Sequence, residues 1–258
     1  QGAAPRRGAR VIKMASQVLG TAIKVFGTAI GTSILLPLVE TQVAKVLLPS
    51  LYATGVAGLP KAFGITIAVT AASAFWLTMY GFSVSGARKK YMELAKKDGE
   101  KDCEERYSLP NLYVEGNTKY AKAFNCHQRS HQQAFETLPQ FYLFTFSVAF
   151  VFPLTAAFNV GLWLYGRMKW SKGYAGSDGD PSKRYDHPLA FLIFASFMSQ
   201  FLLTLIAATE ITGLLPIVRE LIFPSTAAAA PAVAFAAPSV AEVAATVADQ
   251  AVPVAAAP

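Results

Sequence analysis

The sequence predicts an all-α membrane protein, a four-transmembrane-helix antiparallel bundle preceded by an extra N-terminal hydrophobic segment. Two observations support this fold class. Of the 258 residues, 53% are hydrophobic and only 15% are charged, well below the roughly 25% charge of soluble domains. The charged residues also leave long uncharged windows, which have the length that a helix needs to cross about 30 Å of hydrocarbon.

Two windows are clear membrane spans, and a third is ambiguous. Residues 62–87 and residues 189–209 hold no charged residue, so each is long enough for one crossing. The stretch 25–39 is shorter and contains Pro37. It is an interfacial helix, a helix packed on a partner or a fifth crossing, and its length favours the first two.

A helical hairpin is expected between the two clear spans. Residues 137–166 are uncharged, but the stretch is too long for one helix. It also contains Pro153, and proline disrupts a helix interior. We therefore expect helices over about 120–150 and 155–173, joined by a tight turn.

Most basic residues lie in two loops, 88–122 and 167–186, whereas the hairpin turn is uncharged. In an antiparallel four-helix bundle the loops that follow the first and third helices lie at the same end, so these two loops share one side of the membrane. The positive-inside rule assigns that side to cytosol, matrix or stroma. The net charge is +7, and the basic residues gather beside the apolar spans. This placement fits anionic lipid head groups or an anionic substrate better than nucleic acid.

The two ends of the chain differ in composition from the bundle. Residues 1–39 carry five basic residues and no acid, which resembles the remnant of an organellar transit peptide or a basic arm on a membrane surface. We divide the chain into this N-terminal arm (1–60), a membrane domain (61–223) and a low-complexity tail of Ala, Pro and Val (224–258). The tail has no periodic apolar face, so we expect disorder in isolation.

A polar stretch, FNCHQRSHQQAFETLPQF (124–141), opens the first helix of the hairpin. Arg129, Gln133 and Glu136 recur there at spacings of four and three. On a helix their side chains lie on one face and can converge on one ligand. The alternative is a satisfied polar network between helices.

The two histidines of this stretch point away from Glu136. His127 and His131 have the i, i+4 spacing of a helical metal pair. No third ligand of suitable spacing follows, so we predict no metal site; contact with a pigment or haem stays an open alternative. Cys103 and Cys126 make no disulfide framework.

Three blocks of the sequence resemble one family. FNCHQRSHQQAFETLPQF is similar to the second-helix signature of the MAPEG superfamily, the membrane-associated proteins of eicosanoid and glutathione metabolism, and above all to its type-3 microsomal glutathione transferase branch. GFSVSGARKKY (81–91) resembles the end of the family's first helix. GYAGSDGDPSKR (173–184) resembles its third loop, and the likeness covers about residues 61–215.

The resemblance implies homotrimers that hold glutathione between neighbouring subunits at the charged side of the membrane. By position, Arg88 and Arg129 would contact carboxylates of the peptide. Glu136 would contact its amino group. Gln133 stands on the same binding face, where the family usually has Asn.

The resemblance also implies that Arg184 and Tyr174 are catalytic. Only the thiolate of glutathione is a good nucleophile, and a guanidinium stays charged while it is buried. Arg184 would therefore face the thiol. Trp170 replaces the first of two family tyrosines, and the segment between Tyr174 and Arg184 is longer than in the family.

The function that this implies is a glutathione-dependent membrane transferase or peroxidase acting on lipophilic electrophiles or lipid hydroperoxides. The alternative is an accessory subunit of a large organellar complex, photosynthetic or respiratory, with catalysis reduced or lost. The extra segment and the departures near Arg184 motivate this alternative. The basic start favours a plastid thylakoid or mitochondrial inner membrane over the endoplasmic reticulum. We expect membrane lipids as partners and no nucleic acid.

Overall fold

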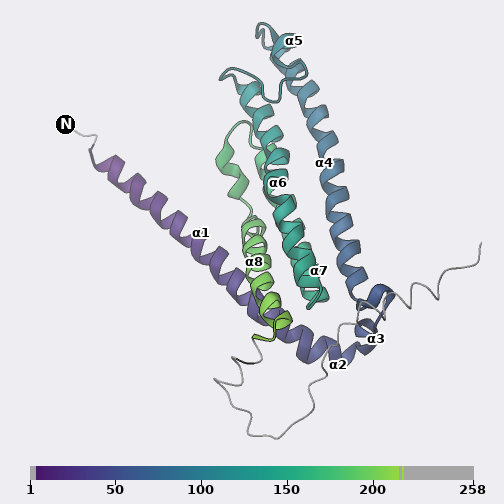
Figure 1. Cartoon of the computed structure of the whole chain (residues 1–258). Coiled ribbons are helices and arrows are strands. Elements are labelled where there is room, and N and C mark those ends of the chain that lie inside the picture. Colours follow the sequence, from purple (N-terminus) through teal and green to yellow (C-terminus); the bar gives the residue numbers. More distant parts are fainter. Residues whose placement is uncertain (1–3, 215–216, 218–258) are drawn as a thin grey trace, which may run out of the picture. The chain divides into compact units, whose positions relative to one another are not determined.

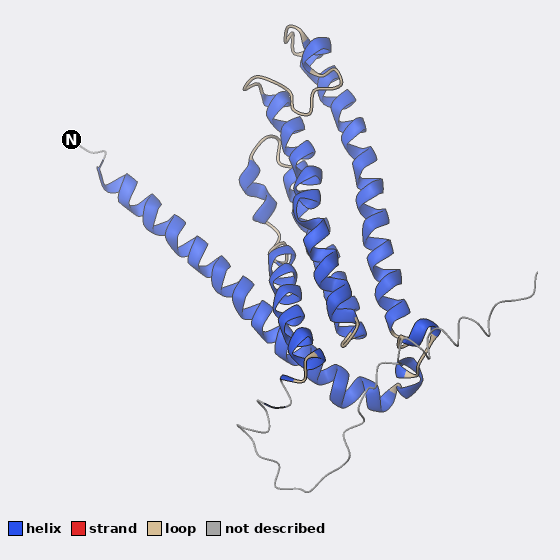
Figure 2. Ribbon diagram, viewed as in Figure 1, coloured by secondary structure: helices blue, strands red, loops and turns tan. Residues whose placement is uncertain are grey.

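The computed structural model describes residues 4–214 and residue 217 (Figure 1). Helices dominate this part of the chain (Figure 2), and its only β-type pairing is an isolated bridge between Thr54 and Pro60. The described residues 4–214 belong to one compact unit, which contains every helix named below. The tail predicted over 224–258 lies outside the described residues.

Four long helices form the bundle of this unit: α4 (Phe63–Lys97), α6 (Lys119–Ala149), α7 (Pro153–Ala175) and α8 (Leu192–Ile211). Helices α6 and α7 each pack against the other three. Length and composition identify α4, α8 and the stretch Val18–Leu47 as candidate membrane spans among the described residues. The four crossings of the bundle stay a prediction, because α6 and α7 carry more polar residues.

The bounds of the hairpin helices differ slightly from the sequence prediction. Pro153 begins α7 instead of lying in the turn, because the first position of a helix needs no backbone N–H donor and suits the fixed φ of proline. Helix α4 continues ten residues beyond the uncharged window that ends at Ala87.

Short helices connect the long ones: α2 (Lys45–Leu47), α3 (Pro49–Tyr52), η2 (Val56–Gly58), α5 (Cys103–Arg106) and η3 (Pro181–Tyr185).

The hydrophobic segment before the bundle is longer than the sequence predicted. Helix α1 runs over Ala4–Val39 and continues as a π-helical turn, η1 (Glu40–Ala44). Pro37 lies inside α1 and does not end it. Apolar helices tolerate proline where local π-helical adjustment satisfies the freed backbone groups. The length argument against a fifth crossing therefore fails.

A buried carboxylate fixes this segment to the bundle. Helix α1 packs along α8, and Glu40 at its end is only 2% exposed. The Glu40 carboxylate accepts hydrogen bonds from the backbone N–H groups of Leu154 (3.0 Å) and Thr155 (2.6 Å) and from the Tyr52 hydroxyl (2.9 Å). Since the first N–H groups of a helix have no partner within it, Glu40 acts as the N-terminal cap of α7.

Aromatic side chains fill the space between α6 and α7. Phe141 and Trp163 are buried, and their rings stack with centroids 4.9 Å apart. Gly166 lets the start of α8 approach α7, because a Cβ there would lie 2.8 Å from the backbone nitrogen of Ile193. Helix α7 is therefore packed tightly against both α6 and α8.

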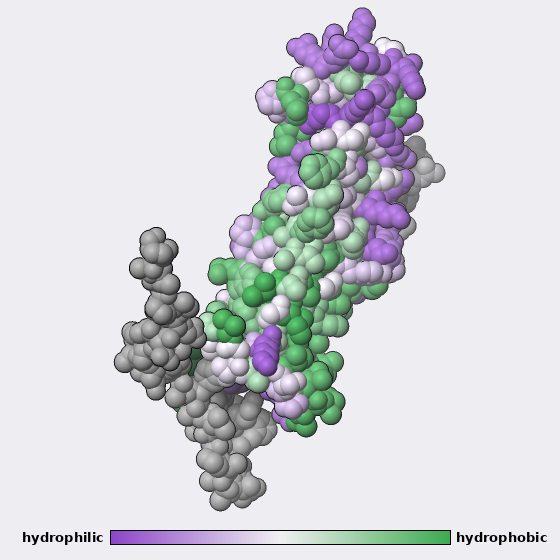
Figure 3. Space-filling model, turned by 90° about the vertical axis from the view of Figure 1, so that its right-hand side faces the viewer, coloured by the Kyte–Doolittle hydropathy of each residue, from purple (hydrophilic) through white to green (hydrophobic). Residues whose placement is uncertain are grey.

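Hydrophilic residues gather at one end of the bundle. The loops that follow α4 and α7 both lie there, and Figure 3 shows polar surface at that end and apolar surface below it. The first loop is held by an ion pair between Arg106 and Glu100 at 2.9 Å. The short turn between α6 and α7 lies at the opposite end. Both charged loops thus share one side, as the sequence indicated.

Candidate functional site

The polar face at the start of α6 is engaged in a network. Arg129 Nη2 lies 3.0 Å from Glu136 Oε2, and Nη1 makes a second contact with Oε1. Gln133, between them, accepts a hydrogen bond from Arg167 Nη2 at 2.6 Å. Arg129 and Glu136 are therefore joined to each other, and Gln133, which lies between them on α6, is joined to α7 through Arg167.

Arg167 is the site residue that the sequence analysis missed, because it lies where the predicted helix 155–173 and the charged stretch 167–186 overlap. It is 1% exposed, and its Cζ lies 5.5 Å from the ring of Trp163 and 5.1 Å from that of Trp170. Its Nε and Nη1 have no hydrogen-bond partner among the described residues. The signal was available, since Arg167 lies four residues after one tryptophan and three before the other, on the same helical face.

A buried guanidinium without a carboxylate is unfavourable, because desolvating a charge costs several kcal/mol unless a partner compensates. Arg167 has one neutral hydrogen-bond acceptor, the amide oxygen of Gln133, and two aromatic faces. This environment favours an anion near the unpaired donors.

Arg184 and Tyr174 meet beside this network. Arg184 Cζ lies 5.3 Å from the ring centroid of Tyr174 and 4.7 Å from that of Tyr185. Gly173 permits the approach, because a Cβ there would lie 2.6 Å from the carbonyl oxygen of Lys183. The lengthened segment before Arg184 therefore does not separate it from Tyr174.

Arg88 occupies a different place. Its guanidinium donates hydrogen bonds to the carbonyl oxygens of Tyr107 (3.3 Å), Asn111 (2.8 Å) and Leu112 (3.3 Å). Its Cζ also lies 4.5 Å from the ring of Phe124. Arg88 therefore anchors the first charged loop to α4.

The two histidines of α6 face α4. His127 Nε2 lies 3.0 Å from the hydroxyl of Ser83, and its ring lies parallel to that of Tyr80. His131 packs on Gly81, where a Cβ would lie 3.0 Å from its Nε2. In the described part of the chain, no group of three or more His, Cys, Asp or Glu residues is arranged to hold a metal ion.

The residues that the structure brings together lie along the contact between α6 and α7, with Arg184 following α7. We call this group the α6–α7 seam; it consists of Arg129, Gln133, Glu136, Arg167, Tyr174 and Arg184. Its three guanidinium groups exceed the single Glu136 carboxylate by two positive charges. Such a site attracts an anionic ligand and stabilises an anion that forms during a reaction.

The chain matches a known protein family. The family model of the MAPEG family matches residues 66–209, a range that begins inside α4 and ends inside α8. It includes the whole seam and excludes α1. No solved structure matches the chain. The match and the three apolar helices identify an integral membrane protein.

Proposed function

Because the chain belongs to the MAPEG family, we propose that it is a glutathione-dependent membrane enzyme that conjugates lipophilic electrophiles or reduces lipid hydroperoxides. The α6–α7 seam carries this proposal. Glutathione with an ionised thiol has two carboxylates, one ammonium and one thiolate, and this charge complements the three guanidinium groups and one carboxylate of the seam. The likeness of the seam sequence to type-3 microsomal glutathione transferases supports the same assignment.

Binding of the peptide exchanges one ion pair for two. Arg129 and Glu136 are partly exposed, with side-chain exposures of 37% and 44%. Such exposed pairs contribute only about 0–1 kcal/mol, so opening this one costs little. A carboxylate of glutathione then pairs with Arg129 and its ammonium group with Glu136. The free donors of Arg167 supply a further anion site beside Gln133.

Arg184 and Tyr174 surround the sulfur in this proposal. A free thiol has a pKa near 8.5, and lowering it by about two units requires roughly 2.7 kcal/mol of preferential thiolate stabilisation. Burial lowers the pKa of Arg184, whereas hydrogen bonding with Tyr185 and Tyr174 raises it, and the net direction is upward. The guanidinium therefore keeps its charge beside the thiolate.

We extend the proposal to a homotrimer in an organellar membrane, with the plastid thylakoid or mitochondrial inner membrane preferred because of the basic N-terminal residues. In one protomer Arg88 does not contact the seam residues. A neighbouring protomer would bring its own Arg88, already fixed by the loop carbonyls, to share the second carboxylate of the peptide with Arg167.

A second candidate, the accessory subunit of a large organellar complex, is favoured by α1. This helix lies outside the family match and exposes apolar side chains one turn apart, at Phe26, Ile30 and Ile34, which are 52%, 51% and 57% exposed in the single chain. Native electrophoresis of solubilised membranes separates the two candidates. A band near three times 27.6 kDa favours the trimeric enzyme, and migration with a much larger assembly favours the subunit.

The enzyme proposal is tested with the full-length protein in detergent. Calorimetric titration should show glutathione binding at micromolar to millimolar concentrations. The same preparation should conjugate glutathione to a generic electrophile or reduce a fatty-acid hydroperoxide. Neither binding nor turnover at millimolar glutathione would contradict the proposal.

A further inference from the structure

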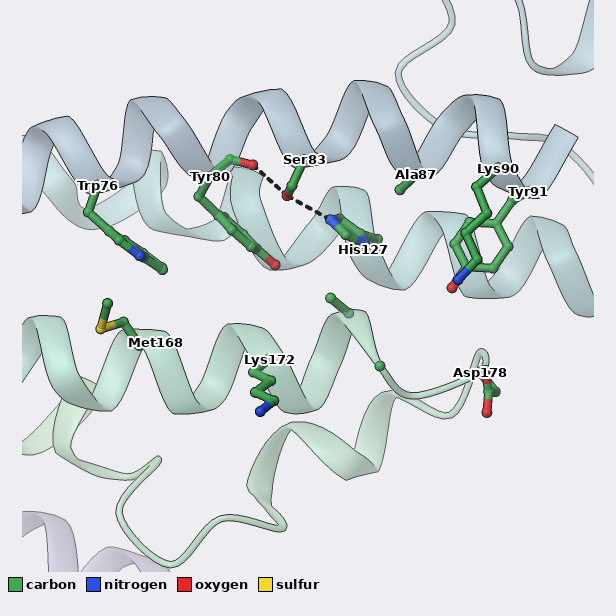
Figure 4. A pocket seen from close by; sticks show the side chains of 12 residues that line it. Trp76, Tyr80, Ser83, Ala87, Lys90, Tyr91, His127, Met168, Lys172 and Asp178 are labelled. Atoms are coloured by element: carbon green, nitrogen blue, oxygen red, sulfur yellow. Dashed lines mark hydrogen bonds between the residues drawn. The ribbon is translucent and has the colours of Figure 1, made fainter.

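A cavity of about 590 Å³ lies between α4, α6 and α7. None of the residues of the α6–α7 seam lines it. Figure 4 shows side chains of α4 along one wall and Met168 and Lys172 of α7 along the other, with His127 of α6 between them. Its volume is within the range of small-molecule sites, about 300–1,000 Å³.

The deep part of this cavity is apolar. The rings of Trp76 and Tyr80 stack at 5.2 Å with an interplanar angle of 7°, and the ring of His127 continues the stack at 5.9 Å from Tyr80. Met168 faces them from α7 (Figure 4). Trp76 and Tyr80 belong to the uncharged window of α4, so this surface lies at membrane depth and suits an acyl chain.

The shallow part of the cavity is basic. Lys90 lies 14 residues after Trp76 on α4, hence about 21 Å further toward the charged end. Lys172 lies four residues, about 6 Å, after Met168 on α7, so it lies deeper in the cavity than Lys90 (Figure 4). Neither ammonium group forms an ion pair with a described residue; Lys90 Nζ lies 5.1 Å from the ring of Tyr91. Asp178 lines the shallow end near Lys90 (Figure 4), so along the whole cavity two lysines exceed one carboxylate by one positive charge.

We propose that this cavity binds an anionic lipid of the bilayer. The charged head group lies in the stretch of the cavity between the levels of Lys172 and Lys90, which the long, flexible lysine side chains reach from either end, and an acyl chain covers Trp76 and Tyr80. Basic pockets between membrane helices on the charged side bind anionic head groups in this way. A soluble anion would leave the aromatic surface uncovered, and a neutral lipid would leave the two lysines unpaired. The site is independent of the glutathione chemistry of the seam.

Fluorescence quenching by brominated lipids tests the site directly. Of the three tryptophans, Trp163 and Trp170 are buried whereas Trp76 is partly exposed in the cavity. The full-length protein is placed in phosphatidylcholine nanodiscs that contain a small fraction of brominated phosphatidylglycerol or brominated phosphatidylcholine. We expect stronger quenching by the anionic lipid, and Trp76→Phe should remove the difference.

A pair of double variants locates the charge. Lys90→Ala with Lys172→Ala should weaken phosphatidylglycerol binding about thirtyfold, which corresponds to about 1 kcal/mol for each basic residue. Lys89→Ala with Lys169→Ala removes the same charge from adjacent positions that do not line the cavity. Brominated phosphatidylglycerol should quench the fluorescence of this variant as strongly as that of the parent. Met168→Glu, at a position 39% exposed, should also lower the quenching, whereas Met168→Leu should not.

Three results would overturn the proposal. Equal quenching by the two phospholipids would show no anionic preference, which is also the outcome if a second protein copy covers the cavity. Equal loss in both double variants would reflect general surface charge. Excess quenching by brominated stearic acid alone would assign the cavity to a free fatty acid and not to a bilayer lipid.

Discussion

Replacing Arg167 with Met and Gln133 with Leu should stabilise the protein in the absence of glutathione. The native guanidinium is buried, and its hydrogen-bond partner is Gln133. Replacing a buried ionic group and its partner by apolar residues of similar size is often neutral or stabilising by about 1–4 kcal/mol. The lost cation–π contacts with two tryptophans offset about 0.5–2 kcal/mol of this gain. The expected net gain of about 1–2 kcal/mol raises the melting temperature by about 2–8 °C for a chain of this size.

The assay is thermal unfolding in detergent with and without glutathione. A ligand at about 100 times its Kd stabilises the parent by about 2.7 kcal/mol, and we expect this increment to disappear in the double variant. Arg167→Met alone is the matched control. It leaves the amide oxygen of Gln133 without its donor, so it should be less stable than the double variant by about 1–3 kcal/mol. A double variant that melts below the parent, yet is still stabilised by glutathione, would make Arg167 a structural residue and refute its role in binding.

Three further substitutions test separate parts of the structure. Arg184→Ala should leave glutathione affinity within a few fold but raise the pKa of the bound thiol toward 8.5. Turnover at neutral pH should then fall about tenfold for each pKa unit and partly recover at alkaline pH. An unchanged pH–rate profile would exclude Arg184 as the activating group. Glu136→Gln should weaken glutathione binding by the roughly 1.5–3 kcal/mol of a charge-assisted hydrogen bond, and unchanged affinity in calorimetry would assign the residue to helix packing. Glu40→Ala should lower the unfolding free energy by about 2–4 kcal/mol, because the first turn of α7 loses its cap. Thr41→Ala, whose hydroxyl bonds within its own helix, is the control, and equal melting temperatures for the two variants would argue against the cap.

The helices were predictable where composition alone determines them. Uncharged windows located α4 and α8, and the hairpin followed from Pro153 and the excess length of the uncharged stretch. The length of helix α1 was underestimated because the uncharged stretch 25–39 is short and contains Pro37, whereas the helix runs over Ala4–Val39 and a π-helical turn follows it. The cap formed by Glu40 joins residues more than a hundred positions apart. No local pattern encodes a contact of that kind.

The candidate site was predictable along one helix and not between helices. The spacing of Arg129 and Glu136 correctly placed them within reach of each other. The spacing of Arg167 from Trp163 and Trp170 was visible along one helix, but its burial and its hydrogen bond to Gln133 depend on how α6 packs on α7. The hydrogen bonds from Arg88 to loop carbonyls were equally hidden, since they depend on the path of an irregular loop.

The central claim is that the α6–α7 seam binds glutathione and favours its thiolate. The most direct measurement is the ultraviolet absorbance of the thiolate during a glutathione titration of the full-length protein in detergent at neutral pH. Our account predicts a saturable thiolate signal that is lost in the Arg184→Ala variant while calorimetry still detects binding. A parent protein that gives neither a thiolate signal nor a heat of binding up to millimolar glutathione would contradict it.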